Sequence, residues 1–99
     1  MTYTLIISPE AEKDIEAAFE WYNRQSSQLG SEFVREVDRS LSQIQQFPES
    51  NAIIYKNTRR KLLKRFPYGI FYVLESATIV TIACFHARQD PESWEQRSP

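Results

Sequence analysis

The sequence predicts an α+β domain in which a hairpin of two helices lies across one face of a twisted, mostly antiparallel sheet. In the first half of the chain apolar residues recur at helical spacing, whereas the second half holds short runs of β-branched and aromatic residues. Each helix has one apolar face, which the sheet would cover. With 99 residues, of which 41% are hydrophobic, we expect residues 1–99 to form a single domain. The predicted order is one strand, two helices, three strands and a short C-terminal helix.

The first strand and the first helix meet at a turn signal. Residues 3–7 are aromatic, β-branched or aliphatic, which favours a strand. Ser8 is expected to cap the following helix and Pro9 to take its first position, where the missing N–H costs nothing. The helical spacing of the apolar residues predicts that this helix ends near Asn23.

A polar stretch leads into the second helix. Ser26 or Ser27 is expected to cap it, and Gly30 weakens its first turn by ~1 kcal/mol relative to alanine. Pro48 ends the helix, because a residue that precedes proline is driven away from helical angles. Since the connection between the helices is short, we expect them to lie antiparallel.

Three strands are expected in the second half of the chain. One carries Leu62 and Leu63, and the two longer runs 67–74 and 78–86 predict a hairpin because only a short turn separates them. Both runs are apolar at odd-numbered and at even-numbered positions alike, which indicates burial on both faces of the sheet. The N-terminal strand reaches the sheet through the helical crossover, so it can pair in parallel with its neighbour.

The C-terminal residues repeat the pattern that begins the first helix. Asp90 is expected to act as a cap and Pro91 to take the first helical position. The short helix that follows could dock Trp94 on the body of the domain.

Composition excludes several classes of protein. The single cysteine, Cys84, cannot form an internal disulfide or a cysteine zinc site, and it is expected to be a small buried hydrophobe. The sequence holds no glycine-rich phosphate loop, no cluster of metal-ligating residues and no recognisable hydrolase triad, so no metal and no cofactor is expected. It also lacks a long apolar run and a basic leader, so we expect a cytoplasmic protein that does not enter a membrane.

The near-neutral net charge of -1 conceals a segregation of charge along the chain. Residues 1–50 hold nine acids and four bases, a balance of -5, whereas residues 51–99 hold four acids and eight bases, a balance of +4. Six of those eight bases lie between Lys56 and Arg65, where there is no acid. A local positive potential therefore survives on this basic segment.

Several short motifs follow one another along nearly the whole chain. They are Ser8-Pro9-Glu10-Ala11, Trp21-Tyr22, Phe47-Pro48, Arg65-Phe66-Pro67-Tyr68 and Phe85-His86-Ala87-Arg88. In their order and spacing the sequence resembles the RelE/ParE superfamily of bacterial toxins, in particular the ParE-like branch with its plasmid stabilisation proteins. The resemblance implies the RelE/ParE-like fold and a cytoplasmic bacterial toxin that a co-encoded antitoxin neutralises in a hetero-oligomer. It also implies one of two targets, since members either poison DNA gyrase or cleave messenger RNA on the ribosome.

RNA cleavage without a metal needs a base for the 2′-hydroxyl, cations for the phosphate and an acid for the leaving oxygen. His86 is the only histidine, the residue type that most often acts as a general acid or base, and Arg65, Arg88 and Arg60 complete the candidate catalytic set. The basic segment contains no carboxylate that could act as the base, so this set is incomplete. The alternative is that His86 ends a strand and hydrogen-bonds a backbone carbonyl, while Arg88 pairs with Asp90 or Glu92.

A second hypothesis is a toxin that inhibits gyrase by protein binding alone. Trp21 lies off the apolar stripe of the first helix and could be an exposed interface anchor, or it could pack against the second helix or the terminal segment. The candidate binding residues are Lys56, Arg59, Lys61, Lys64, Trp21 and Trp94. The basic segment suits either a phosphate backbone or an acidic antitoxin that folds on contact. A third hypothesis is a degenerate, non-toxic binding module.

Overall fold

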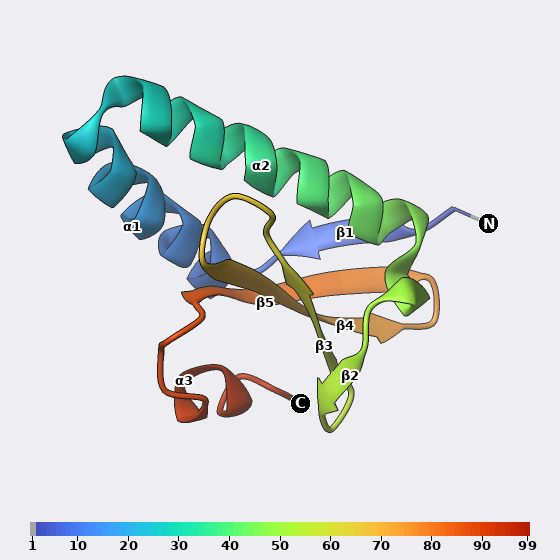
Figure 1. Ribbon diagram of the computed structural model, residues 1–99. Coiled ribbons are helices and arrows are strands. Elements are labelled where there is room, and N and C mark those ends of the chain that lie inside the picture. The colour runs from blue at the N-terminus through green and yellow to red at the C-terminus, as the bar shows by residue number, and fades with distance from the viewer. Residues whose placement is uncertain (1) are drawn as a thin grey trace.

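The computed structural model describes residues 2–99 and confirms the α+β class: two long helices lie across one face of a five-stranded sheet (Figure 1). The elements are β1 (Thr4–Ile7), α1 (Pro9–Gln25), α2 (Ser27–Gln46), a 3-10 turn (Pro48–Ser50), β2 (Ile53–Tyr55), β3 (Thr58–Leu62), β4 (Tyr68–Glu75), β5 (Thr78–His86) and α3 (Glu92–Glu95). The strand order in the sheet is β1-β5-β4-β3-β2. As predicted, β1 runs parallel to its neighbour β5, and all other neighbouring strands are antiparallel.

The sheet contains one strand more than the sequence predicted. β2 has only three residues and pairs with β3 across a two-residue turn, in which Lys56 has a φ of 50°. Three residues are too few for an alternating pattern to be visible in the sequence. The strand lies at the edge of the sheet, so the order of the inner strands is unaffected.

The helix boundaries follow from capping. The Ser8 hydroxyl accepts a hydrogen bond from the Ala11 N–H at 3.1 Å, which confirms the predicted cap of α1. Ser26 ends α1 and begins α2: its N–H donates to the Tyr22 carbonyl at 3.0 Å, and its hydroxyl accepts from the Gln28 N–H at 3.2 Å. Helix α1 therefore runs two residues beyond the predicted end at Asn23.

Gly30 has a packing role that its low helix propensity did not reveal. It is buried where α2 crosses the end of α1, and a Cβ atom at this position would lie 2.9 Å from the Cβ of Asn23. Real Cβ atoms do not approach each other so closely. The glycine therefore permits the close contact of the two helices that makes the hairpin compact.

The sheet is buried on both faces, as the two apolar strands predicted. On the face under the helices, Phe33 and Ile44 of α2 pack with Ile70 and Tyr72 of β4. On the opposite face a second cluster forms around Phe71, Ile82, Phe85 and Trp94. The residues of β4 alternate between these two clusters.

The C-terminal segment covers part of this second face. Trp94 is 8% exposed and stacks on Phe71 with ring centroids 4.8 Å apart, so the predicted docking of the tryptophan is confirmed. Arg97 forms a two-pronged ion pair with Asp14 of α1 at 2.6 and 3.3 Å, and its guanidinium lies over the ring of Phe85. The segment thus ties the end of the chain to the first helix. Within residues 2–99, no helix is both long and apolar enough to cross a membrane.

Candidate functional site: an aromatic groove and a basic surface

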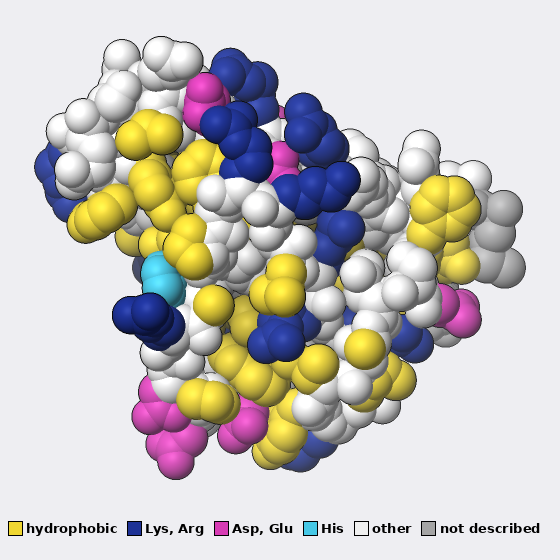
Figure 2. Space-filling view, viewed as in Figure 1, with side chains coloured by type: hydrophobic (Ala, Val, Ile, Leu, Met, Phe, Trp, Pro, Cys, Tyr) yellow, Lys and Arg dark blue, Asp and Glu magenta, His cyan; other side chains and the backbone are white. Residues whose placement is uncertain are grey.

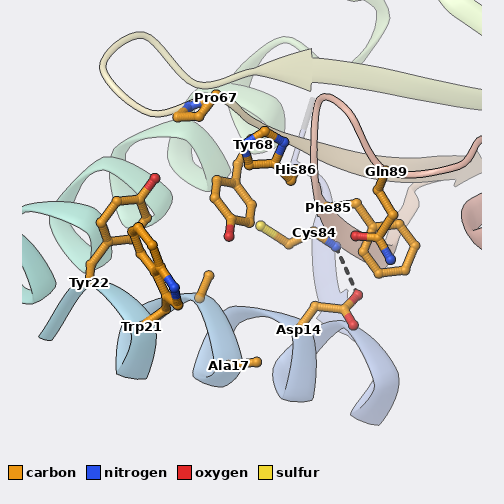
Figure 3. A pocket seen from close by; sticks show the side chains of 11 residues that line it. Asp14, Ala17, Trp21, Tyr22, Pro67, Tyr68, Cys84, Phe85, His86 and Gln89 are labelled. Atoms are coloured by element: carbon orange, nitrogen blue, oxygen red, sulfur yellow. Dashed lines mark hydrogen bonds between the residues drawn. The ribbon is translucent and has the colours of Figure 1, made fainter. Parts of the chain in front are cut away.

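A groove of about 650 Å³ lies between α1, the start of β4 and the end of β5 (Figure 3). Its walls come from α1, from the loop before β4, and from the end of β5 with the residues that follow. The lining residues are Asp14, Ala17, Ala18, Trp21, Tyr22, Pro67, Tyr68, Cys84, Phe85, His86 and Gln89. Most of this lining is apolar or aromatic, which is typical of a binding site for an organic group.

Trp21 is the most accessible large apolar side chain of the groove. It is 50% exposed, and its ring meets the Tyr22 ring edge-on with centroids 5.1 Å apart. Tyr22 in turn packs against Phe33 and Phe66 in the core. The tryptophan therefore rests on a rigid aromatic base while much of its indole stays in contact with solvent, as the second of the sequence hypotheses expected.

Two tyrosines, Tyr22 and Tyr68, line the groove, and both hydroxyls keep their protons at neutral pH. Burial raises the pKa of Tyr22 above its ordinary value of 10.0. Burial also raises the pKa of Tyr68, with smaller contributions from the neighbouring Tyr22 and Cys84. Both side chains consequently present O–H groups at neutral pH.

His86 stands at the end of β5, directly opposite Tyr68 of β4. The two rings meet nearly edge-on, with centroids 5.3 Å apart. The Nδ1 atom of His86 accepts a hydrogen bond from the Arg88 backbone N–H at 3.0 Å, so Nδ1 carries no proton in this arrangement. The neutral imidazole therefore carries its proton on Nε2, where it is a hydrogen-bond donor.

The floor of the groove is held by an ion pair. Asp14 accepts from the Cys84 backbone N–H at 3.0 Å and from both terminal nitrogens of Arg97, so its two carboxylate oxygens are engaged. Burial, with a smaller effect of Asp14, raises the pKa of the Cys84 thiol to about 12. Cys84 is thus an inert buried hydrophobe, as predicted. Asp14 is the only carboxylate among the groove residues, and within residues 2–99 no cluster of metal-ligating side chains occurs.

The basic segment does not form one surface, because its side chains alternate along β3 and then leave the sheet. Arg59 connects β3 to the segment before β2, since its guanidinium donates to the carbonyls of Glu49 and Asn51 at 3.2 and 2.7 Å. Arg60 lies opposite Phe71, on the face away from the helices, and its side chain crosses over Gly69. Lys56 sits in the β2–β3 turn, 5.4 Å from the centroid of the Tyr55 ring.

The remaining bases of the segment lie beside α2. The Lys64 backbone N–H donates to Glu36 Oε1, and Arg65 pairs with Glu32, both at 3.1 Å. Lys61 lies opposite Ile70, on the helix side of β3. In Figure 2, dark blue side chains gather around magenta ones over α2.

Two arginines of α2 join this surface, and sequence reasoning missed them. Arg35 and Arg39 are exposed, and Arg39 pairs with Glu36 at 3.1 Å. The sequence assigned the helical half of the chain a negative balance, which hid these two bases. A signal was available, because residues 35 and 39 share a helix face with residues 32 and 36.

The candidate catalytic residues are only partly brought together. Arg88 is exposed and close to His86 through its backbone. His86 lies on the helix side of the sheet with Tyr68, whereas Arg60 lies on the opposite side with Phe71. Arg65 faces α2 through its ion pair with Glu32. The structure therefore does not place all four side chains on one face of the sheet. Of the candidate binding residues, Trp21 lines the groove while Trp94 is buried.

Comparison with known proteins agrees with this architecture. Residues 5–91 match the family model described as the ParE toxin of the type II toxin–antitoxin system, parDE. A solved structure titled as the chromosomal ParDE toxin–antitoxin system from P. aeruginosa is similar, with a TM-score of 0.76 and 16% identity over 86% of this chain and 96% of that one. A mutant of the E. coli toxin RelE in the free state has a TM-score of 0.60 and 15% identity over 96% of this chain and 94% of that one. Among curated protein sequences none gives a significant match.

Proposed function

The chain belongs to the ParE toxin family of type II toxin–antitoxin systems, and from this premise we propose that it inhibits DNA gyrase by binding to it. In this proposal the toxin catalyses no reaction of its own, and a co-encoded antitoxin neutralises it in the cytoplasm of a bacterium. The groove beside α1, with the half-exposed indole of Trp21 on its wall, is the observation that carries the proposal.

An accessible tryptophan on a rigid base suits the centre of a protein interface. Such side chains contribute most of the binding energy at protein–protein contacts, because they bury a large area at a small cost in conformational entropy. Here Tyr22 and the core aromatics fix the orientation of the Trp21 ring. The neighbouring polar groups, the Tyr68 hydroxyl and the His86 Nε2, add directional hydrogen bonds at the rim of the same groove.

The placement of the charged residues favours binding over RNA cleavage. A metal-independent ribonuclease needs its base, acid and phosphate-binding cations around one phosphate. Arg60 and His86 lie on opposite sides of the sheet, and the one carboxylate of the groove, Asp14, has both oxygens engaged by Arg97 and the Cys84 N–H. The groove thus has aromatic surface and hydrogen-bond donors, but no free base beside His86.

Expression of the chain in a bacterial culture tests the target. We expect growth arrest with gyrase-linked DNA breaks and intact transcripts. Trp21→Ala should abolish the breaks while the variant stays folded, and Phe47→Ala is the matched control, because Phe47 is also an exposed aromatic (64%) but lies at the far end of α2. Prompt messenger RNA cleavage that His86→Ala and Arg65→Ala abolish would instead identify a ribonuclease. Absence of any growth effect would identify a degenerate binding module.

Co-expression with the neighbouring small reading frame tests the antitoxin partner. We expect a stable hetero-oligomer to co-purify and growth to be restored. A neighbouring product that neither co-purifies nor restores growth would contradict this part of the proposal without bearing on the gyrase contact.

A further inference from the structure

The exposed side of α2 carries a charged surface that is separate from the aromatic groove. Five cations form it, two from α2 and three from the end of β3 and the loop that follows. We call this surface the basic ridge, and it consists of Arg35, Arg39, Lys61, Lys64 and Arg65. Three acids lie among or beside these cations: Glu32, Glu36 and Asp38, which is exposed on α2 three residues after Arg35. The ridge therefore keeps a balance of +2 (five bases minus three acids) on a chain whose net charge is -1.

Two of these acids, Glu36 and Glu32, hold neighbouring groups of the ridge in place. Glu36 is 4% exposed and divides its oxygens between the Lys64 backbone N–H and Arg39, both at 3.1 Å. Glu32 holds Arg65 at 3.1 Å. Because these carboxylates face inward, Arg39 and Arg65 are held in place while their outer faces remain accessible: their side chains are 62% and 63% exposed.

The side chains of the ridge indicate which class of polyanion it suits: an acidic peptide, a single-stranded nucleic acid or a duplex. Among residues 2–99 the exposed large aromatic side chains are Trp21 and Phe47, and neither lies in the segments that carry the ridge, residues 32–39 and 61–65. Leu62 is exposed within these segments, but it lies on the other face of β3 from Lys61. An acidic peptide that folds on contact needs apolar anchors, and single-stranded nucleic acid needs rings on which its bases stack. The phosphate backbone of a duplex needs only cations on an open surface.

We propose that the basic ridge binds the phosphate backbone of double-stranded DNA without reading its sequence. The inference rests on the proposed function in its biological setting, since a gyrase inhibitor meets its target on duplex DNA. The binding itself is a property of the free chain and is measurable without gyrase. Arginine suits this contact because its planar guanidinium can bond to two phosphate oxygens at once.

The size of the effect follows from the number of contacts. Each neutralised phosphate contributes about -0.9 to the slope of log K against log salt, so five contacts give at most about -4.5. Non-specific binding of this kind has a Kd on the order of 10⁻⁴ to 10⁻⁶ M, and the acidic remainder of the chain keeps it at the weak end at physiological salt. Contacts to gyrase would raise the effective concentration of DNA beside the ridge.

The test is fluorescence anisotropy of a labelled 30-base-pair duplex, titrated with the free protein across a series of low salt concentrations. The variant is the double substitution Arg35→Gln with Lys64→Gln, because neither side chain has a hydrogen-bonding partner that holds the fold within residues 2–99. The matched control is Lys13→Gln with Arg24→Gln, which removes the same charge from exposed positions on α1.

We expect the ridge variant to lose about tenfold in affinity at low salt and about 2 units of salt slope, while the control stays near the parent protein. Equal losses in both variants would overturn the proposal, because net charge and not the ridge would then govern binding. It is also overturned if the parent protein does not bind the duplex, or if polyglutamate of equal charge competes as well as unlabelled duplex. A failure of the gyrase proposal would leave these binding curves unchanged.

Discussion

Removal of one buried hydroxyl should destabilise the domain measurably. Tyr72 of β4 is fully buried, and its hydroxyl donates to the Pro48 carbonyl at 2.6 Å and accepts from the Asn51 side-chain amide at 3.1 Å. These two bonds fasten the 3-10 turn after α2 to the centre of the sheet. The substitution Tyr72→Phe keeps the ring and its packing and removes only the oxygen.

The magnitude follows from the groups left without a partner. Pro48 is buried, so its carbonyl cannot recover the lost bond from water, whereas Asn51 is half-buried and can be rehydrated. One unsatisfied buried acceptor costs about 1–3 kcal/mol in the free energy of unfolding. For a domain of this size a loss of about 2 kcal/mol lowers the Tm by roughly 8–16 °C.

Urea denaturation followed by circular dichroism measures this loss as a fall in the midpoint at constant slope. The matched control is Tyr68→Phe on the same strand, because the Tyr68 hydroxyl borders the groove and makes no hydrogen bond to the described residues 2–99. The control should change the free energy of unfolding by less than about 0.5 kcal/mol. Equal losses in the two variants, or no loss in Tyr72→Phe, would refute the assignment of this energy to the buried hydrogen bonds.

Three further predictions concern two groups inside the core, the Cys84 thiol and the Thr81 hydroxyl. Cys84, whose folded pKa is raised to about 12 from an ordinary value of 9.0, should resist alkylation in the native protein at pH 8 and react once the protein is unfolded; rapid native alkylation would contradict its burial. Above pH 9 the unfolded thiol loses its proton while the buried folded thiol keeps it, so the free energy of unfolding should decrease with pH. The expected decrease is about 1.4 kcal/mol per pH unit between pH 9 and 12, and this contribution is fully present below pH 9. Urea titration of the parent protein against Cys84→Ala measures it. Thr81→Val should raise the free energy of unfolding by about 1 kcal/mol, because the Thr81 hydroxyl is fully buried and has no partner among the described residues; a lower thermal midpoint for this variant would show that the hydroxyl is satisfied.

The elements of this fold were predictable where local chemistry decides them. Ser8 with Pro9 marks the start of α1, Pro48 follows the end of α2, and the apolar runs of β4 and β5 indicate burial on both sides. The sequence was less informative where a tertiary contact decides. β2 is too short to show a pattern, and the value of Gly30 depends on Asn23 of the other helix.

The candidate site shows the same division. Trp21 was identified from its position off the apolar stripe of a helix, which a helical period alone determines. The spacing of the basic residues did not predict which of them share a surface. Adjacent residues of a strand point to opposite faces of the sheet, and the packing of the neighbouring strand decides which of these faces the helices cover. Arg60 and Lys61 are neighbours in sequence, yet they lie opposite Phe71 and Ile70, on different sides of the sheet.

One short loop joins the aromatic groove to the basic ridge, and this links the two proposals physically. In residues 63–67, Lys64 and Arg65 face α2 and its acids, while Phe66 packs against Tyr22 and Phe33 in the core. Pro67, the next residue, lines the groove. The carbonyl of Pro67 accepts from the Ala87 N–H at 2.7 Å, which fastens the loop to the strand end that carries His86. A loop held at both ends in this way fixes the two surfaces relative to each other. A partner that presents protein and duplex DNA side by side, as gyrase does, could therefore engage the groove and the ridge at the same time without first ordering the toxin.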